Sequence, residues 1–361
     1  MSVNKFNLSA VIVLVVALIF SCTAKENKNN SALSLGLSNY TIPLFNKGAV
    51  IGQIYYGSHR HNNNFQLIKD TSALFTINTE GYLALKDHIE LTLEGNIFVF
   101  GITIGVNGIN KEIELVKDDF LTNKIVAHRG AWKKNEVSEN SLSSLRNAIE
   151  LGCGWSEFDI WLSADGVPVL SHNSIIGGFE IEKTNIEELQ KVELKNNDRV
   201  STLEEYLKEI KNQNGTRLFL EIKPSDISDE RGLALAQEAV QIVHHMKAQA
   251  WVNYISFDLN LLLKVNELDP FAKTAYLGND KTVEELHDLG ITGIDFNKSM
   301  FQNDDTLIPL AHEFGMSTNA WTVNNSLEMR FLLNLGIDYI TTNEPELLKE
   351  ILIEESSTPQ K

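Results

Sequence analysis

The segment Arg217-Leu218-Phe219-Leu220-Glu221-Ile222-Lys223 contains the alternation that decides the fold of this chain. Successive side chains of an extended strand point to opposite faces, so Glu221 and Lys223 would share one face and the aliphatic residues between them the other. From Lys124 onward, similar short apolar segments alternate with amphipathic helical segments. This alternation is typical of a parallel α/β architecture.

Nine strand candidates follow Lys124, one more than a (β/α)8 barrel contains. They are Ile125–His128, Ser156–Ile160, Pro168–His172, Leu218–Lys223, Tyr254–Phe257, Thr274–Leu277, Gly293–Phe296, Thr318–Trp321 and Tyr339–Thr342. The link from Ile160 to Pro168 is too short for a crossover helix, and Asp165-Gly166 is a strong signal for a two-residue hairpin turn. We therefore predict a TIM-type (β/α)8 barrel at residues 120–354 with one added β-hairpin, and a disordered tail at residues 355–361.

Two segments inside the predicted barrel indicate helix starts. Thr202-Leu203-Glu204-Glu205 and Thr282-Val283-Glu284-Glu285 each place a glutamate three residues after a threonine. This spacing predicts a capping box, in which the two side chains hydrogen-bond to each other's backbone N–H groups.

The first 22 residues have the layout of a secretory signal peptide. Lys5 precedes an apolar stretch from Leu8 to Phe20 that is too short to span a bilayer comfortably. The ending Ile19-Phe20-Ser21-Cys22 resembles a bacterial lipobox, in which Cys22 becomes the lipid-modified first residue of the mature protein. The alternative is an ordinary signal peptide cut nearby. Either way we expect export, and lipidation would make the chain a membrane-anchored lipoprotein of the cell envelope, periplasmic or surface-exposed.

Two further segments separate the signal peptide from the barrel. Residues 23–36 are mostly polar or small, which predicts a flexible tether. Residues 37–119 contain short alternating runs between Asn and Gly turns, and we predict a small all-β sandwich. The run from Phe75 to Leu83 resembles the middle of cadherin-like repeats, but the acidic calcium motifs of those repeats are largely missing. We therefore expect a spacer or packing module rather than a ligand-binding one.

Charge and cysteine content restrict the possible partners. The formal net charge of -17 would repel nucleic-acid phosphates, so no nucleic-acid partner is expected. Lipidation of Cys22 would leave Cys153 as the one remaining cysteine, which excludes an intramolecular disulfide framework. We expect Cys153 to pack as a small buried residue.

Three acidic residues on predicted strands indicate a metal site. Glu157 and Asp159 lie two apart on one strand, so both carboxylates would project into the barrel mouth, and Glu221 would join them from another strand. Buried carboxylates repel one another unless a cation lies between them. Oxygen ligands suit a hard ion, so we predict one divalent metal ion, Mg²⁺ or Ca²⁺.

Basic residues lie at or near the ends of predicted barrel strands. His128 and His172 end two of the apolar runs, and they would stand at the barrel rim as a general acid and a general base. A two-residue turn at Asp165-Gly166 would set His172 opposite Asp159. Arg129 and Lys223 would supply positive charge to a phosphate. Each feature alone is explained as well by an ordinary ion pair or a satisfied polar residue, but together they favour one catalytic mouth.

The motifs that carry these residues occur in a characteristic order. They are Val126-Ala127-His128-Arg129-Gly130, Glu139-Asn140, Glu157-Phe158-Asp159, Leu170-Ser171-His172, Glu221-Ile222-Lys223 and Trp321-Thr322-Val323-Asn324. The region from Lys124 to Leu352 therefore resembles the glycerophosphodiester phosphodiesterase family.

The resemblance implies a barrel of the PLC-like phosphodiesterase kind that hydrolyses a glycerophosphodiester to glycerol 3-phosphate and an alcohol. It also implies the same roles for the metal ligands, the histidines and the phosphate-contacting residues. Phe179, Trp132 and Trp321 are candidates for lining the glycerol or alcohol side of the substrate, although an aromatic residue near a barrel rim is as often there for packing. Two positions depart from the family pattern, because Asn173 and Asn343 stand where the family normally has Asp. Both changes remove a negative charge, so we expect them to affect the rate and the pH optimum.

Two other functions are also compatible with the sequence. A related phosphodiesterase could act on intact phospholipids, which the predicted anchor favours, but the motifs have no neighbouring aromatic-basic cluster that would dock on a membrane. A non-catalytic surface lipoprotein could instead bind a partner through its β-module. The soluble glycerophosphodiester is the favoured substrate.

Overall fold

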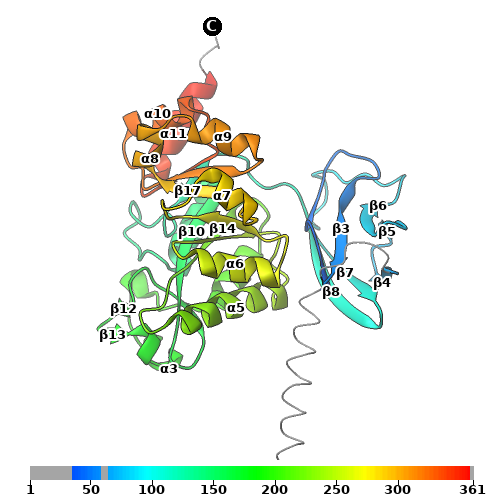
Figure 1. Ribbon diagram of the computed structural model, residues 1–361, viewed down its shortest axis with the longest axis horizontal. Helices are drawn as coiled ribbons and strands as arrows, with labels where there is room; N and C mark the ends of the chain where they lie inside the picture. The colour runs from blue at the N-terminus through cyan, green and yellow to red at the C-terminus, as the bar shows by residue number, and fades with distance from the viewer. Residues whose placement is uncertain (1–34, 58–63, 358–361) are drawn as a thin grey trace, which may run out of the picture.

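The computed structural model describes residues 35–57 and 64–357 (Figure 1). The predicted signal peptide, Cys22 and most of the predicted tether lie outside the described residues. Within the described parts, no helix is both long enough and apolar enough to cross a membrane.

The N-terminal part is all-β, as predicted. One four-stranded sheet has the order β1-β3-β6-β5, and a second has the order β2-β8-β7-β4. The strands are β1 Leu35–Leu37, β2 Thr41–Ile42, β3 Val50–Tyr56, β4 Gln66–Asp70, β5 Phe75–Ile77, β6 Tyr82–Leu85, β7 Val99–Val106 and β8 Ile109–Lys117. Buried apolar side chains of both sheets form one common core, which makes this β-module a sandwich. Its first strand begins at Leu35, inside the segment expected to be a tether.

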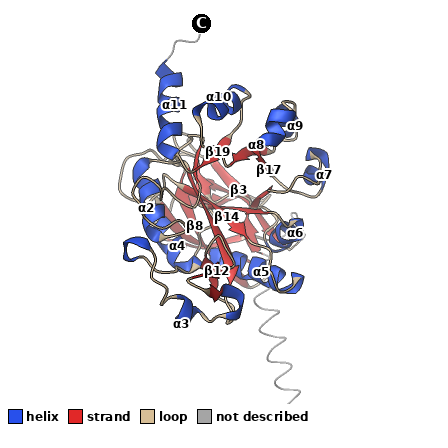
Figure 2. Ribbon diagram, turned by 90° about the vertical axis from the view of Figure 1, so that its left-hand side faces the viewer, coloured by secondary structure: helices blue, strands red, loops and turns tan. Residues whose placement is uncertain are grey.

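The C-terminal part is a closed barrel of eight parallel strands, which confirms the predicted fold (Figure 2). The barrel strands are β9 Ile125–Ala127, β10 Trp155–Leu162, β14 Arg217–Ile222, β15 Val252–Ser256, β16 Lys273–Tyr276, β17 Gly293–Asn297, β18 Ser317–Trp321 and β19 Tyr339–Thr342. Pairing of β19 with β9 and of β9 with β10 closes the ring.

Helices cover the outside of the barrel (Figure 2). They are α2 Leu142–Leu151, α3 Ile186–Leu189, α4 Leu203–Ile210, α5 Asp229–His245, α6 Leu259–Leu268, α7 Val283–Asp288, α8 Lys298–Asn303, α9 Leu307–Glu313, α10 Ser326–Asn334 and α11 Pro345–Ser357. Both predicted capping boxes are present, at the starts of α4 and α7. Helix α11 continues to Ser357, past the expected start of the disordered tail.

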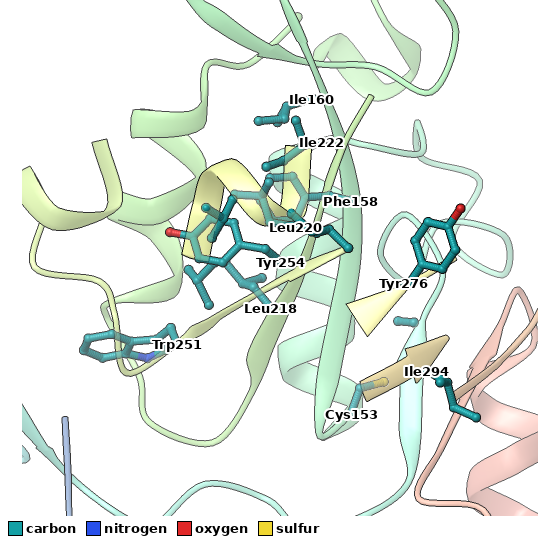
Figure 3. Close-up of a cluster of buried hydrophobic side chains, with 14 of the residues drawn as sticks. Cys153, Phe158, Ile160, Leu218, Leu220, Ile222, Trp251, Tyr254, Tyr276 and Ile294 are labelled. Atoms are coloured by element: carbon teal, nitrogen blue, oxygen red, sulfur yellow. The ribbon is translucent and has the colours of Figure 1, made fainter. Parts of the chain in front are cut away.

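Strand alternation separates the barrel interior from the helix-facing core, as the sequence predicted. Outward-pointing residues of β10 and β14, such as Phe158 and Leu220, pack with Trp251 and Tyr254 in one apolar cluster (Figure 3). Cys153 belongs to the same cluster and is fully buried. The residues between the outward-pointing ones therefore face the barrel interior.

The hairpin formed by β10 and β11 Pro168–Leu170 differs from the prediction by one residue. The observed pairs include Ile160 with Leu170, and Ser163 closes the loop by donating its N–H to the carbonyl of Val167. The loop thus has three residues, with Gly166 at φ +83°, instead of a two-residue turn. The predicted opposition of Asp159 and His172 is wrong, because the Ser171 N–H bonds to the Asp159 carbonyl and the strand ends before His172.

The β-module contacts the barrel at the amino-terminal ends of the barrel strands. Asp118 pairs with Arg217, the first residue of β14, at 2.9 Å, and Tyr55 Oη donates to Asp269 Oδ1 at 3.1 Å in the loop before β16. Catalytic residues of this fold lie at the opposite, carboxyl-terminal ends. The β-module therefore leaves the barrel mouth uncovered (Figure 1).

Candidate active site

Three carboxylates gather at the carboxyl-terminal ends of β10 and β14. Glu157, Asp159 and Glu221 each offer an oxygen within 4.8 Å of the others, and their exposed fractions are 3%, 1% and 7%. Burial raises the pKa of Glu157 well above its usual range, with further contributions from the other two carboxylates, and burial raises the pKa of Glu221 to about 8. Burial and the mutual repulsion of the carboxylates therefore both favour the protonated forms of Glu157 and Glu221.

The donor set fits a divalent cation. Glu157 Oε2 accepts the Arg129 backbone N–H at 2.9 Å, but Oε1 is buried and has no hydrogen-bond partner among the described residues. A buried unpaired oxygen is costly unless another group satisfies it. Three acidic oxygens with one unpaired atom match the ligands that Mg²⁺ and Ca²⁺ prefer, so this cluster could hold such an ion.

The turn after β9 shapes one wall of the site. Arg129 has a left-handed backbone conformation, with φ +59°, which directs its N–H to Glu157. Gly130 follows with φ +80°, and a Cβ atom there would lie 2.6 Å from the carbonyl carbon of Ser144. Only glycine combines this conformation with such a close approach to the start of α2.

Asn140 holds Asp159 in place from the loop before α2. Its Nδ2 donates to Asp159 Oδ2 at 2.9 Å, and its Oδ1 accepts the Asp159 backbone N–H at 3.0 Å. Burial raises the pKa of Asp159, but Lys223 and the Asn140 amide lower it more, so the pKa lies below its usual value. The sequence motif contained Asn140, but its role as a positioning residue was not predicted.

His128 lies beside the carboxylates at the end of β9. Its Nδ1 is 2.7 Å from Asn343 Oδ1, and its Nε2 is 3.9 Å from Glu157 Oε2. Burial lowers the pKa of His128 to about 4, with nearby Arg129 as the next cause. A neutral ring that donates Nδ1–H to the asparagine leaves Nε2 as a proton acceptor facing the carboxylate cluster.

His172 faces the same cavity from the chain that follows β11. Its Nδ1 is 3.0 Å from Asn173 Oδ1, and its carbonyl accepts the Trp161 Nε1–H at 3.3 Å. Partial burial lowers the pKa of His172, while Asp159 opposes this shift. The bend after Leu170, rather than the predicted strand register, brings His172 to the site.

The two predicted phosphate-contacting residues also lie here, but both have protein partners. The Lys223 ammonium is 2.7 Å from Glu221 Oε1 and 3.1 Å from Asp159 Oδ1. Arg129 Nη1 donates to both oxygens of Glu139 at 3.0 Å, whereas its buried Nε has no hydrogen-bond partner in the described chain. Each side chain therefore places a positive charge at the edge of the cluster.

A cavity of about 130 Å³ joins these groups. It is lined by His128, Arg129, Glu157, His172, Glu221, Lys223, Ile255, Phe257, Leu277, Asp295, Trp321, Thr322 and Thr341. Trp321 packs edge-to-face on Phe257, with ring centroids 5.3 Å apart, and Trp132 lines the adjoining cavity. Asp295 was not predicted, because it belongs to none of the motifs and stands alone as an acid on its strand.

A closed parallel barrel with an acidic cluster and two histidines at the carboxyl-terminal ends of its strands defines a TIM-barrel hydrolase. Residues 128–347 match the glycerophosphoryl diester phosphodiesterase family, and the chain belongs to that family.

Individual relatives agree with this assignment. A glycerophosphodiester phosphodiesterase of Caldanaerobacter subterraneus subsp. tengcongensis is 26% identical over 242 residues, which cover 62% of this chain and 95% of the relative. The crystal structure of a glycerophosphodiester phosphodiesterase from Parabacteroides distasonis gives a TM-score of 0.63 at 35% identity, covering 66% of this chain and 100% of that one. A phosphodiesterase of Oleispira antarctica, solved with the product sn-glycerol-3-phosphate, gives a TM-score of 0.55 at 25% identity, covering 64% of this chain and 97% of that one.

Proposed function

We propose that this enzyme hydrolyses glycerophosphodiesters to glycerol 3-phosphate and an alcohol, in a metal-dependent reaction with histidine acid and base catalysis. The observation that carries the proposal is one cavity lined by both histidines, Arg129 and members of the carboxylate cluster. Family membership and the product named for the Oleispira structure support this substrate class.

Glu157, Asp159 and Glu221 would hold the ion, Mg²⁺ or Ca²⁺. When bound, it would supply positive charge that stabilises the charge developing on the phosphoryl oxygens. Arg129 and Lys223 would add positive charge at the edge of the site, and Trp321 would cover the carbon skeleton of the substrate.

The two histidines have different environments, which favours different roles. We assign His128 as the general base, because its low pKa keeps Nε2 free to take a proton from the attacking water or glycerol hydroxyl. His172, which is less buried and lies near Asp159, would give a proton to the departing alkoxide. If the glycerol hydroxyl attacks, the alcohol leaves and a cyclic phosphate forms; water then opens this ring with the two histidines in exchanged roles, so each returns to its starting state. If water attacks directly, proton exchange with solvent restores both histidines.

Purified protein should hydrolyse glycerophosphocholine or glycerophosphoethanolamine when Mg²⁺, Ca²⁺ or Mn²⁺ is supplied. His128→Ala and Glu157→Ala should each reduce kcat by at least about a hundredfold. His245→Ala is the matched control, because His245 is exposed on the outer helix α5 and its loss should leave kcat unchanged. Activity that survives both site substitutions would refute the site assignment.

A second candidate, hydrolysis of intact phospholipids, gains support from the loops around the mouth. The small sheet of β12 Ile175–Ile176 and β13 Phe179–Glu180 exposes Ile175 and Phe179, with exposed fractions of 55% and 40%. Loops after β14 and β15 expose Ile227 and Phe257, with exposed fractions of 51% and 42%. Exposed apolar groups around a site can contact lipid. A panel of soluble glycerophosphodiesters compared with phospholipid vesicles distinguishes the two candidates, and higher kcat/KM on vesicles would favour the second.

We also propose that the protein is exported and anchored to a membrane of the cell envelope through Cys22. The support is the sequence pattern of the first 22 residues. Cys22→Ser should move the protein from the membrane fraction to the soluble fraction of the producing cells. Equal membrane recovery of both forms would contradict a lipid anchor at this residue.

A further inference from the structure

Asp295 is a third acidic residue that lines the cavity, besides Glu157 and Glu221. It lies on β17, on the face of the strand that points into the barrel, and it lines the cavity together with His128, His172 and Trp321. Its exposed fraction is 1%. Among the described residues, the acids that could share one metal ion are Glu157, Asp159 and Glu221, so Asp295 stands apart from the cluster.

Asp295 presents an unpaired oxygen. Its Oδ1 is buried and accepts no hydrogen bond within the described chain, and no lysine, arginine or histidine in residues 35–57 and 64–357 forms an ion pair with it. Leaving such an acceptor unpaired is costly, so an additional donor is needed. Burial raises the pKa of Asp295 to about 7, and a hydrogen bond from the side chain of Asn319 opposes this shift.

The neighbouring strand supplies a second acceptor. Asn319 on β18 is the register partner of Asp295, and its Nδ2 donates to Thr341 Oγ1 at 2.8 Å. Its Oδ1 is also buried without a hydrogen-bond partner in the described residues. Two unpaired acceptor oxygens therefore come from adjacent positions of the barrel wall.

Trp321 forms an apolar wall beside these acceptors. Its Nε1 donates to the Asp295 carbonyl oxygen at 2.9 Å, which fixes the indole next to the strand that carries Asp295. A small group bound here would meet hydrogen-bond acceptors on one side and an aromatic face on another. Hydroxyl groups on a short carbon chain have this character, since each hydroxyl donates a hydrogen bond and the C–H groups pack on the ring.

We propose that Asp295 hydrogen-bonds the free hydroxyls of the glycerol part of the substrate, with Asn319 as its positioning residue. This inference rests on the proposed glycerophosphodiester function and adds the residue that selects a vicinal diol over other phosphate substituents. Asp295 sets specificity and takes no part in the proton transfers.

The first test compares a diester that has glycerol with one that lacks it. In Asp295→Leu, kcat/KM for glycerophosphocholine should fall about tenfold to a hundredfold more than kcat/KM for bis(4-nitrophenyl) phosphate. Asp295→Asn keeps an acceptor oxygen and should show a smaller difference. Asp288→Leu is the control, because the Asp288 side chain is 83% exposed, and it should leave kcat/KM for both diesters unchanged. Equal losses on both diesters, or no loss, would overturn the proposal.

The second test measures binding and does not depend on turnover. Calorimetry with Mg²⁺ present compares glycerol 3-phosphate with inorganic phosphate, and the wild-type protein should bind glycerol 3-phosphate more tightly. Asp295→Leu should remove that preference while retaining phosphate affinity. A preserved preference, or none in the wild type, would overturn the inference. Absence of wild-type turnover with a preference that depends on Asp295 would refute the proposed function alone.

Discussion

Two asparagines set the orientation of the two histidines that we propose as acid and base. Asn343 accepts from His128, and Asn173 accepts from His172, in each case at Nδ1. These are the two positions where the sequence departs from the family's aspartates. An amide oxygen holds the same tautomer as a carboxylate would, but it adds no negative charge to stabilise an imidazolium. Both rings therefore keep their geometry and become weaker bases.

Asn343→Asp should shift the pH dependence of the reaction. A carboxylate beside Nδ1 raises the pKa of His128 from its value of about 4, by about one to three units. Because the base must be unprotonated, the acidic limb of kcat/KM should move to higher pH by the same amount. The pH profile of glycerophosphocholine hydrolysis measures this shift. An unmoved acidic limb would contradict the role of His128 as the base.

The carboxylate cluster predicts how stability depends on pH without metal. The pKa of Glu221 is raised to about 8, so the folded state binds a proton more tightly than the unfolded state between about pH 4.5 and pH 8. Without metal, the free energy of unfolding should therefore fall by roughly a few kcal/mol as the pH rises from about 4.5 to about 8. Thermal melting in chelator measures the fall, and Mg²⁺ or Ca²⁺ should reduce it. Glu221→Gln should flatten the metal-free profile, and a profile that remains steep would implicate other groups.

Strand alternation predicted the carboxylates and the lysine correctly as neighbours, because two-residue spacing fixes the face of a strand. It did not identify Asn140 as the partner of Asp159, since that contact joins a loop to a strand 19 positions away. Asp295 was missed for a related reason. A single acid on an apolar strand has no local pattern, and its relation to the histidines exists only after the barrel closes.

At the scale of elements, the turn between β9 and α2 connects packing to catalysis. Gly130→Ala combines an unfavourable positive φ with overlap against Ser144, so it should lower the free energy of unfolding by about 2–5 kcal/mol. It should also reduce kcat/KM, because the same turn carries His128 and Arg129. Denaturant unfolding and kinetics measure the two effects.

Gly166→Ala is the matched control for this substitution. Gly166 has φ +83° in the hairpin loop, but a Cβ atom there would meet no atom within 4 Å. Gly166→Ala should lower the free energy of unfolding only by the backbone cost of about 1–2 kcal/mol, and its kcat/KM should be unchanged. Equal effects of the two substitutions would show that close packing on Ser144 is unimportant.

The same hairpin shows the limit of prediction at this scale. The sequence placed the hairpin correctly, because no crossover helix fits between Ile160 and Pro168, but the second strand ends at Leu170 instead of His172. The predicted length of the hairpin loop was wrong. Asp165-Gly166 is compatible with a two-residue turn and also with a three-residue loop that has glycine in the left-handed position. One residue of register changed the partner of Asp159 from His172 to Ser171, yet the bend after β11 kept His172 at the site.

At the scale of the whole molecule, the β-module lies at one end of the barrel (Figure 1), and the candidate site lies at the other, where the barrel strands end. A buried chain of polar groups joins the module to the barrel. Lys111 Nζ lies 2.9 Å from His244 Nδ1, and His244 Nε2 lies 2.8 Å from Asp269 Oδ2. Asp269 also accepts from Tyr55 of the module, whose ring lies 5.1 Å from that of Phe271.

Asp269→Ala should therefore destabilise the protein without changing its chemistry. Burial raises the pKa of Asp269, but His244 and Lys111 lower it more, so the carboxylate is ionised and its loss leaves buried partners unpaired. Breaking one partner of such a network costs about 3–5 kcal/mol in the free energy of unfolding. Because Asp269 is at the end of the barrel remote from the mouth, kcat/KM of the folded variant should equal that of the wild type. Glu112→Ala, which removes only an exposed partner of Lys247, should change stability little. A large loss of kcat/KM with unchanged stability would show instead that the β-module communicates with the active site.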